Sequence, residues 1–215
     1  MATGEHSLMA ASGQIVMAAD SVESSAPRRS RTLCGGSILA IMPRAIPREH
    51  EPSVSVIREQ FIDAETPVII SGVADQWPAF SRWTPTYLKA AVGDLTVPVA
   101  ESQVGDYFDA EKMYGEVSKQ EMPWSDFIDA VFSPRPGEPV RYLRQRPLAA
   151  FGALAADIET PPFVPRPLLH TNLWVGGAPS VTATHYDSED NFLVQISGEK
   201  ELTLFPAKQL SALYP

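Results

Sequence analysis

The sequence predicts a mostly β fold, a barrel or sandwich of short strands, with a helical part before it. Helical and strand patterns alternate between residues 46 and 143, whereas residues 171–205 consist of short β patterns separated by tight turns. Hydrophobic residues make up 44% of the 215-residue chain and charged residues 20%, which are proportions typical of a globular protein.

The charge and the cysteine content exclude several classes of function. The formal net charge is −9, and the basic clusters are limited to Arg28–Arg31 and Arg141–Arg146. A protein that coats nucleic acid needs a clustered Lys/Arg surface, so this role is not expected. The single cysteine, Cys34, allows no intrachain disulfide and no multi-cysteine zinc site, and it fits a reducing compartment such as the cytoplasm. No apolar run is long enough to span a membrane.

The composition changes near residue 43. Residues 1–43 are rich in Ala, Ser, Gly and Met and show no sustained period of 2 or 3.6 residues. We therefore expect them to form a disordered or loosely attached tail. Residues 44–215 are expected to form the N-terminal and first-half portion of one folded domain.

Periodicity and punctuation residues place the elements of this domain. Helical spacing, capping residues and Pro at a first turn predict helices over residues 53–62, 84–93 and 123–132. Runs of β-branched or alternating apolar residues predict strands over residues 66–72, 95–100, 140–143, 171–175, 182–187, 192–196 and 202–205. Gly198-Glu199 has the composition of a two-residue hairpin turn between the last two strands.

His185 and Asp187 are separated by one residue in a predicted strand, so their side chains should project from the same face. An imidazole and a carboxylate on one face supply two of the three ligands of the 2-His-1-carboxylate triad that binds Fe(II). The tripeptide alone is a weak signal, because a solvated His–Asp pair on a surface strand would give the same pattern.

Lys200 is predicted to share the apolar face of the last strand with Leu202 and Leu204. A lysine directed into a barrel needs an anionic partner, because burying an unpaired ammonium is costly. A bound carboxylate would supply that partner. A position near the rim, from which the lysine reaches water, would explain the pattern equally well.

These motifs together resemble the JmjC-type cupin hydroxylases, and within them most closely the asparaginyl hydroxylase subgroup that acts on hypoxia-inducible factor. The motifs that carry the resemblance are Thr182-Ala-Thr-His185-Tyr-Asp187, Asn191-Phe192, Gly198, Lys200, Leu204-Phe205-Pro206 and, upstream, Pro67–Gly72, Trp77-Pro78-Ala79 and Val140–Leu143. The resemblance covers roughly residues 45–215. It implies a double-stranded β-helix, or jelly roll, which in this chain is truncated before the barrel closes.

The resemblance also implies the ligands of the site. His185 and Asp187 would bind Fe(II). Lys200 would pair with the far carboxylate of 2-oxoglutarate. Tyr142 and Thr182 would hydrogen-bond the same carboxylate.

By the same resemblance, Asn191 would line the co-substrate pocket. The roles of Tyr142 and Thr182 have alternatives. A core aromatic role for Tyr142 remains an equal alternative, and strand parity places Thr182 opposite His185, so that its role needs a bulge or a loop. Trp77, Trp83 and Trp124 are interpreted as packing residues.

The implied function is an Fe(II)- and 2-oxoglutarate-dependent oxygenase, which consumes oxygen and couples the formation of succinate to the hydroxylation of a C–H bond. A protein side chain is expected as the substrate in preference to RNA, no membrane partner is expected, and homodimerisation is left open. Two alternatives remain: a non-catalytic cupin-like binding module that has lost its metal site, and a cupin with isomerase or small-molecule dioxygenase chemistry. The latter usually draws on several histidines.

The family's second metal-binding histidine lies downstream of the motifs, and no histidine follows His185 in this chain. We therefore predict that the 215-residue chain is a fragment that folds poorly and has little or no activity, because two ligands bind iron more weakly than three. Unfolding followed by circular dichroism, with iron content measured in parallel, checks this. A cooperatively unfolding monomer with bound iron would contradict it.

Overall fold

The computed structural model describes residues 8–10, 14–20, 45–107, 119–164, 167–185, 187 and 190–206. The strands in these residues are β1 (Leu8–Ala10), β2 (Gln14–Asp20), β3 (Arg48–His50), β4 (Val68–Ser71), β5 (Thr96–Ser102), β6 (Lys119–Pro123), β7 (Val140–Pro147), β8 (His170–Gly176) and β9 (Asn191–Ser197). The helical elements are α1 (Val54–Val56), η1 (Ile57–Ile62), η2 (Ala74–Gln76), α2 (Pro78–Arg82), α3 (Pro85–Val92), α4 (Trp124–Phe132) and η3 (Leu148–Asp157).

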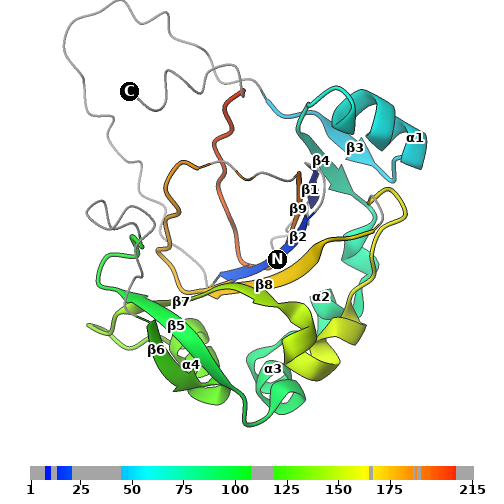
Figure 1. Ribbon diagram of the computed structural model, residues 1–215. Coiled ribbons are helices and arrows are strands. Elements are labelled where there is room, and N and C mark those ends of the chain that lie inside the picture. The colour runs from blue at the N-terminus through cyan, green and yellow to red at the C-terminus, as the bar shows by residue number, and fades with distance from the viewer. Residues whose placement is uncertain are drawn as a thin grey trace, which may run out of the picture.

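The strands form one sheet in the order β3-β4-β1-β9-β2-β8-β7-β5-β6 (Figure 1). Strand β7 pairs antiparallel with β5 and β8, and β2 lies parallel to both β8 and β9. Within the described residues β3 and β6 are the two edges, and the sheet does not close into a barrel. The prediction of a mostly β fold with helices in its N-terminal half is confirmed.

Helices α2, α3, α4 and η3 gather on one side of the sheet, and the segments that follow β8 and β9 run on the other side (Figure 1). The core lies between the sheet and these helices. Its sheet side is formed by alternate residues of β8 and β9, and its helix side includes Trp124, Phe127 and Phe151. The indole of Trp124 is fully buried and donates a hydrogen bond to the carbonyl of Leu88, 2.8 Å away, which ties α4 to α3.

Local sequence explains where helix α3 begins and ends. The Thr84 hydroxyl accepts a hydrogen bond from the N–H of Tyr87 at 3.2 Å, and Pro85 occupies the first turn, where its missing N–H costs nothing. The helix ends at Gly93, whose φ of 70° is unstrained only for glycine. The predicted helix over residues 84–93 is thus confirmed, as are those over residues 53–62 and 123–132.

Two of the predicted strands are wrong. Residues 182–185 and 202–205 form no ladder; an isolated bridge joins Val181 to Asp106. A strand is stable only when a neighbour pairs with its backbone, and the described residues place none beside these two segments. Leu202, Leu204 and Phe205 are accordingly 39%, 49% and 45% exposed.

The N-terminal region takes part in the sheet. Strand β1 pairs antiparallel with β4 and β9, and β2 fills the position between β8 and β9. Both strands lie within residues 1–43, which the composition predicts to be a tail. The domain boundary near residue 43 remains a prediction.

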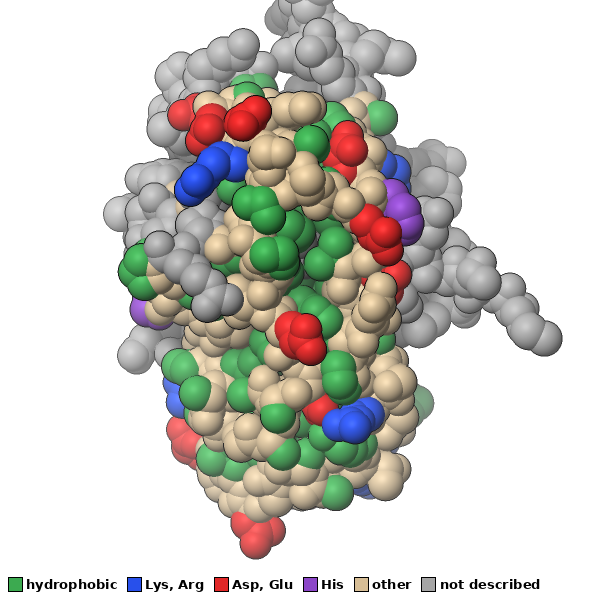
Figure 2. Space-filling model, turned by 90° about the vertical axis from the view of Figure 1, so that its right-hand side faces the viewer, with side chains coloured by type: hydrophobic (Ala, Val, Ile, Leu, Met, Phe, Trp, Pro, Cys, Tyr) green, Lys and Arg blue, Asp and Glu red, His purple; other side chains and the backbone are tan. Residues whose placement is uncertain are grey.

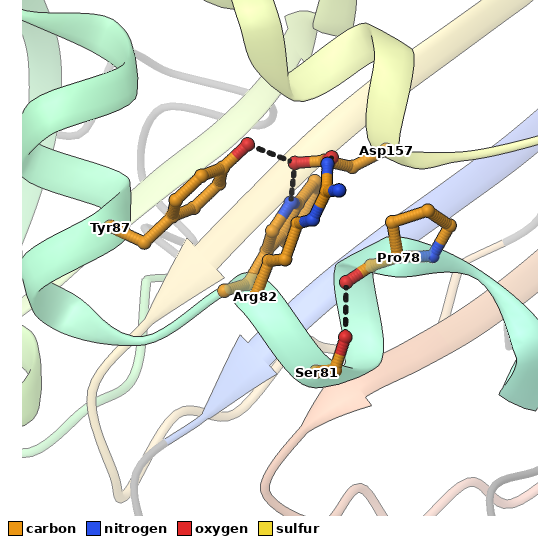
Figure 3. Close-up of polar contacts among 6 residues, drawn as sticks. Pro78, Ser81, Arg82, Tyr87 and Asp157 are labelled. Atoms are coloured by element: carbon orange, nitrogen blue, oxygen red, sulfur yellow. Dashed lines mark hydrogen bonds and ion pairs between the residues drawn. The ribbon is translucent and has the colours of Figure 1, made fainter.

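The carboxylate of Asp157 connects three helical elements (Figure 3). It is 1% exposed and accepts hydrogen bonds from Arg82 Nη1 at 2.9 Å, Trp83 Nε1 at 3.0 Å and the Tyr87 hydroxyl at 2.6 Å. Burial alone would raise the pKa of Asp157, but these hydrogen bonds outweigh burial and hold its pKa below the ordinary value. The network fixes α2 and α3 against the end of η3.

We predict that Asp157→Asn lowers the free energy of unfolding at pH 7 by about 1–3 kcal/mol, because the charge-assisted hydrogen bonds are lost. The folded-state pKa of Asp157 is depressed, so its contribution is present above the unfolded-state pKa of about 4 and is lost as the pH falls through the folded-state pKa. Urea unfolding of both proteins at pH 7 and in increasingly acidic buffer checks this. A wild-type to variant difference that does not narrow in acid would contradict it.

Candidate functional site

The face of the sheet turned away from the helices carries a second, smaller cluster of aromatic side chains. The Tyr142 ring centroid lies 5.2 Å from that of Tyr107 and 6.0 Å from that of Trp174. Tyr142 and Tyr107 are 5% and 7% exposed. These three aromatic rings form a floor beside the segments that follow β8 and β9.

Gly176 makes room for this floor. Tyr142 pairs with Gly176 across β7 and β8, and a Cβ atom on Gly176 would lie 2.6 Å from Tyr142 Cδ2 and 3.3 Å from Ser180 Oγ. The absence of a side chain therefore lets the tyrosine ring lie flat over β8. Tyr142 is a buried aromatic residue, which agrees with one of its two interpretations. Its contact with a co-substrate remains a prediction.

The structure brings His185 and Asp187 together without a strand. His185 Nε2 lies 4.0 Å from Asp187 Oδ1, and the two side chains are 53% and 49% exposed. The Nδ1 atom of His185 is 2.8 Å from the carbonyl oxygen of Ala183. An Nδ1–H donated to that carbonyl leaves the Nε2 lone pair directed toward the carboxylate.

Asn191 supports the carboxylate from the first position of β9. Its Nδ2 donates a hydrogen bond to Asp187 Oδ2 at 2.6 Å. This contact occupies one carboxylate oxygen and leaves Oδ1, the atom that faces His185, available. Asn191 is predicted to line the co-substrate pocket; its described contact is with the candidate metal ligand.

The chemistry of these donors suits a divalent metal. Nitrogen and oxygen ligands lie about 2.0–2.2 Å from a bound ion, and adjacent ligands of one ion therefore lie about 3 Å apart. His185 Nε2 and Asp187 Oδ1, now 4.0 Å apart, would have to approach each other by about 1 Å to bind one ion side by side. Metal-binding histidines commonly donate their other ring N–H to a carbonyl, and metal-binding carboxylates are commonly hydrogen-bonded. Both features are present here. No group of three such ligands occurs in the described part of the chain.

Thr182 and Lys200 lie on the segments after β8 and β9, which run over the face of the sheet turned away from the helices, here called the second face (Figure 1). Thr182 is exposed and follows Val181 in a stretch that is not a strand, so strand parity no longer sets its direction. Lys200 is half-buried, two residues after Gly198, whose φ is 74°. The structure shows no ion pair of Lys200 with another described residue, and it does not test the predicted contact of either residue with a co-substrate.

Two buried polar atoms on the second face lack a hydrogen-bond partner among the described residues: Trp174 Nε1, a donor, and Gln195 Oε1, an acceptor. Trp174 of β8 and Gln195 of β9 both pair with Ala18 of β2, which lies between these two strands. The two residues are therefore aligned across the sheet. Gln195 is absent from the predicted site. The alternation of β9 could have identified it, since Gln195 shares a face with Asn191.

The comparisons with known proteins agree with this fold. The family of cupin-like domains matches residues 54–215. The chain therefore belongs to the cupin-like family of JmjC oxygenases. The family prediction is confirmed, whereas the closer resemblance to the asparaginyl hydroxylase subgroup remains a prediction.

Three relatives illustrate the similarity. Lysine-specific demethylase 8 of Danio rerio is 33% identical over 180 residues, covering 80% of this chain and 43% of the relative. Jumonji C domain-containing protein 5 of Drosophila melanogaster is 29% identical, covering 79% and 43%. The bifunctional peptidase and (3S)-lysyl hydroxylase JMJD7 of Homo sapiens is 26% identical, covering 84% and 58%. The chain thus spans about half the length of these relatives or somewhat less.

We predict that Gly176→Ala displaces the Tyr142 ring and lowers the free energy of unfolding by about 1–3 kcal/mol, because the new methyl group overlaps the ring. Gly177→Ala is the matched control, since its Cβ would meet nothing closer than 3.5 Å. Urea unfolding and near-ultraviolet circular dichroism report stability and aromatic packing. Equal behaviour of the two variants would contradict the close fit at Gly176.

Proposed function

We propose that this chain carries metal and co-substrate residues of an Fe(II)- and 2-oxoglutarate-dependent oxygenase. One observation carries the proposal: His185 Nε2 and Asp187 Oδ1 face each other at 4.0 Å, while the other polar atom of each side chain is held by Ala183 or Asn191. This arrangement leaves one nitrogen and one oxygen free to bind the same ion.

The remaining roles follow from charge and position. Fe(II) and 2-oxoglutarate, when bound, would activate molecular oxygen, which is the oxidant for hydroxylation of a C–H bond. Lys200 supplies a positive charge for the far carboxylate, and Tyr142 a phenol hydroxyl on the aromatic floor. Trp174 adds a buried N–H whose hydrogen-bonding capacity no described residue uses. An anionic ligand would satisfy both the ammonium and the indole N–H.

No group of three possible metal ligands occurs among the described residues, so the third protein ligand of a facial triad would come from outside them. Two of the three ligands by themselves would bind the metal more weakly than the full triad.

A protein side chain is the proposed substrate. Two of the relatives named above are, by name, a lysine-specific demethylase and a bifunctional peptidase and lysyl hydroxylase. On the face drawn in Figure 2, Lys and Arg lie scattered among Asp and Glu and do not form a stripe that would follow a phosphate backbone.

Within the described residues no helix has the length and hydrophobicity needed to cross a bilayer. A reducing compartment such as the cytoplasm is the proposed location.

A non-catalytic binding module is the second candidate. It is favoured by the exposure of His185 and Asp187, whose side chains are 53% and 49% accessible, and by the lack of a third ligand in the described part of the chain. A module of this kind would not need the Nδ1 contact of His185 or the amide contact of Asp187, both of which leave metal-binding atoms free.

We predict that the chain binds 2-oxoglutarate in the presence of Mn(II), a redox-stable substitute for Fe(II), and that His185→Ala abolishes metal-dependent binding. Lys200→Ala should weaken 2-oxoglutarate binding about 10- to 100-fold, because a hydrogen bond to a charged group contributes about 1.5–3 kcal/mol. Lys89→Ala is the control, since Lys89 pairs with Asp129 on the helical side. Isothermal titration calorimetry measures all four proteins.

Succinate formation with Fe(II) and ascorbate complements the binding measurement. Metal-dependent binding that is lost in His185→Ala, weakened in Lys200→Ala and kept in the control supports the oxygenase. Binding of neither Mn(II) nor 2-oxoglutarate by the folded wild-type chain would contradict it and would favour the binding module.

A further inference from the structure

The loop that leaves β5 contacts both halves of the candidate site. Residues 103–107, the clamp loop, lie between β5 and a stretch outside the described residues. At Gly105 the clamp loop meets the segment that leads to His185, and at Tyr107 it meets the ring of Tyr142. The clamp loop thus contacts Val181, which precedes the candidate metal ligands His185 and Asp187 in the chain. It also contacts Tyr142, the residue expected to bind the co-substrate.

The contact at Gly105 is close and specific. The N–H of Val181 donates a hydrogen bond to the carbonyl of Gly105 at 2.8 Å, and Asp106 forms an isolated parallel bridge with Val181. A Cβ on Gly105 would lie 2.7 Å from the carbonyl carbon of Pro179 and closer still to its oxygen. The backbones meet because this position has no side chain.

The contact at Tyr107 fixes the other half. Its ring is 7% exposed and lies 5.2 Å from the ring of Tyr142 at an interplanar angle of 37°. Aromatic pairs at this separation contribute beyond the area they bury. Tyr142 is therefore held from one side by Tyr107 and from another by Trp174, 6.0 Å away.

The base of the clamp loop is anchored by charge. Glu101, one residue before the end of β5, accepts a hydrogen bond from Arg141 Nε at 2.8 Å, and Arg141 Nη1 donates to Glu138 at 3.0 Å. The side chains of Arg141 and Glu101 are 15% and 17% exposed, so solvent screens this pair only in part. The loop therefore starts from a fixed point next to Tyr142 in β7.

We propose that Gly105 and Tyr107 are positioning residues, which set the segment carrying His185 and Asp187 at a defined place relative to Tyr142. The proposal rests on the proposed function, because that function makes His185 and Asp187 the metal ligands and Tyr142 a co-substrate contact. Each residue is proposed to act through a neighbour, Gly105 through Val181 and Tyr107 through Tyr142.

The test compares Gly105→Ala with Gly93→Ala. Both glycines have positive φ, 75° and 70°, so both substitutions strain the backbone. A Cβ on Gly93, however, meets nothing within 4 Å, whereas one on Gly105 overlaps Pro179. Gly93→Ala therefore controls for the introduction of a side chain at a glycine of positive φ, without the overlap at Pro179.

Two readouts are measured on the full chain. Amide hydrogen exchange should become faster over residues 180–185 in Gly105→Ala and stay at the wild-type rate there in Gly93→Ala. The affinity for 2-oxoglutarate with Mn(II) should fall about tenfold or more in Gly105→Ala, as is typical when the support of a metal ligand is removed. Tyr107→Ala should lower the same affinity, while Tyr107→Phe, which keeps the ring, should retain it.

The outcomes separate this proposal from the proposed function. If the wild-type chain binds 2-oxoglutarate and Gly105→Ala shows unchanged exchange and affinity, the positioning role is overturned and the oxygenase stands. Unchanged exchange over residues 180–185 overturns the positioning role even if no ligand binds to the wild-type chain. Should Gly105→Ala not fold, loss of affinity in Tyr107→Ala with retention in Tyr107→Phe supports the proposal, and equal affinity in the two overturns it.

Discussion

The alternation of side chains along β8 and β9 is the constraint on which the rest of the structure depends. Successive residues of a strand point to opposite faces, so one set of positions, including Phe192 and Val194, faces the helices and is fully buried. The other set, including Trp174, Asn191 and Gln195, faces the opposite side. A shift of one residue in either strand would bury amides in the core and expose the phenylalanine. The register that forms the core therefore also forms the floor of the site.

Close backbone approach gives this floor its shape. At Gly176 the missing side chain admits the ring of Tyr142, and at Gly105 it admits the segment that leads to His185. Residues 182–185 consequently cross the second face without belonging to the sheet, and hydrogen bonds to Ala183 and from Asn191 orient the metal-binding atoms. Support from neighbouring side chains and carbonyls replaces the support that a strand would give.

The sequence predicted the parts of the fold whose cause is local. Capping by Thr84 and Pro85 marked helix α3, and the alternating run from residue 192 to residue 196 marked β9. His185 and Asp187 were predicted to lie close together because residues i and i+2 of a strand share a face. The two side chains do approach each other, although the described residues there form no strand. Residues 182–187 and 202–205 were wrongly predicted as strands. The pattern of side chains indicates the β propensity of a segment but does not show whether a neighbouring strand is present to pair with it. The Asp157 network was not predictable, since its carboxylate meets Arg82 and Tyr87 across 75 and 70 residues of chain.

The most direct test of the account is where a paramagnetic metal binds. Substoichiometric Mn(II) added to the isotopically labelled chain broadens the nuclear magnetic resonance signals of nuclei near the bound ion. The account predicts broadening at His185, Asn191 and their neighbours, weaker broadening on the aromatic floor, and none in helix α3 on the other side of the sheet. Uniform broadening, or broadening centred on another acidic region, would contradict the assignment of His185 and Asp187 as metal ligands.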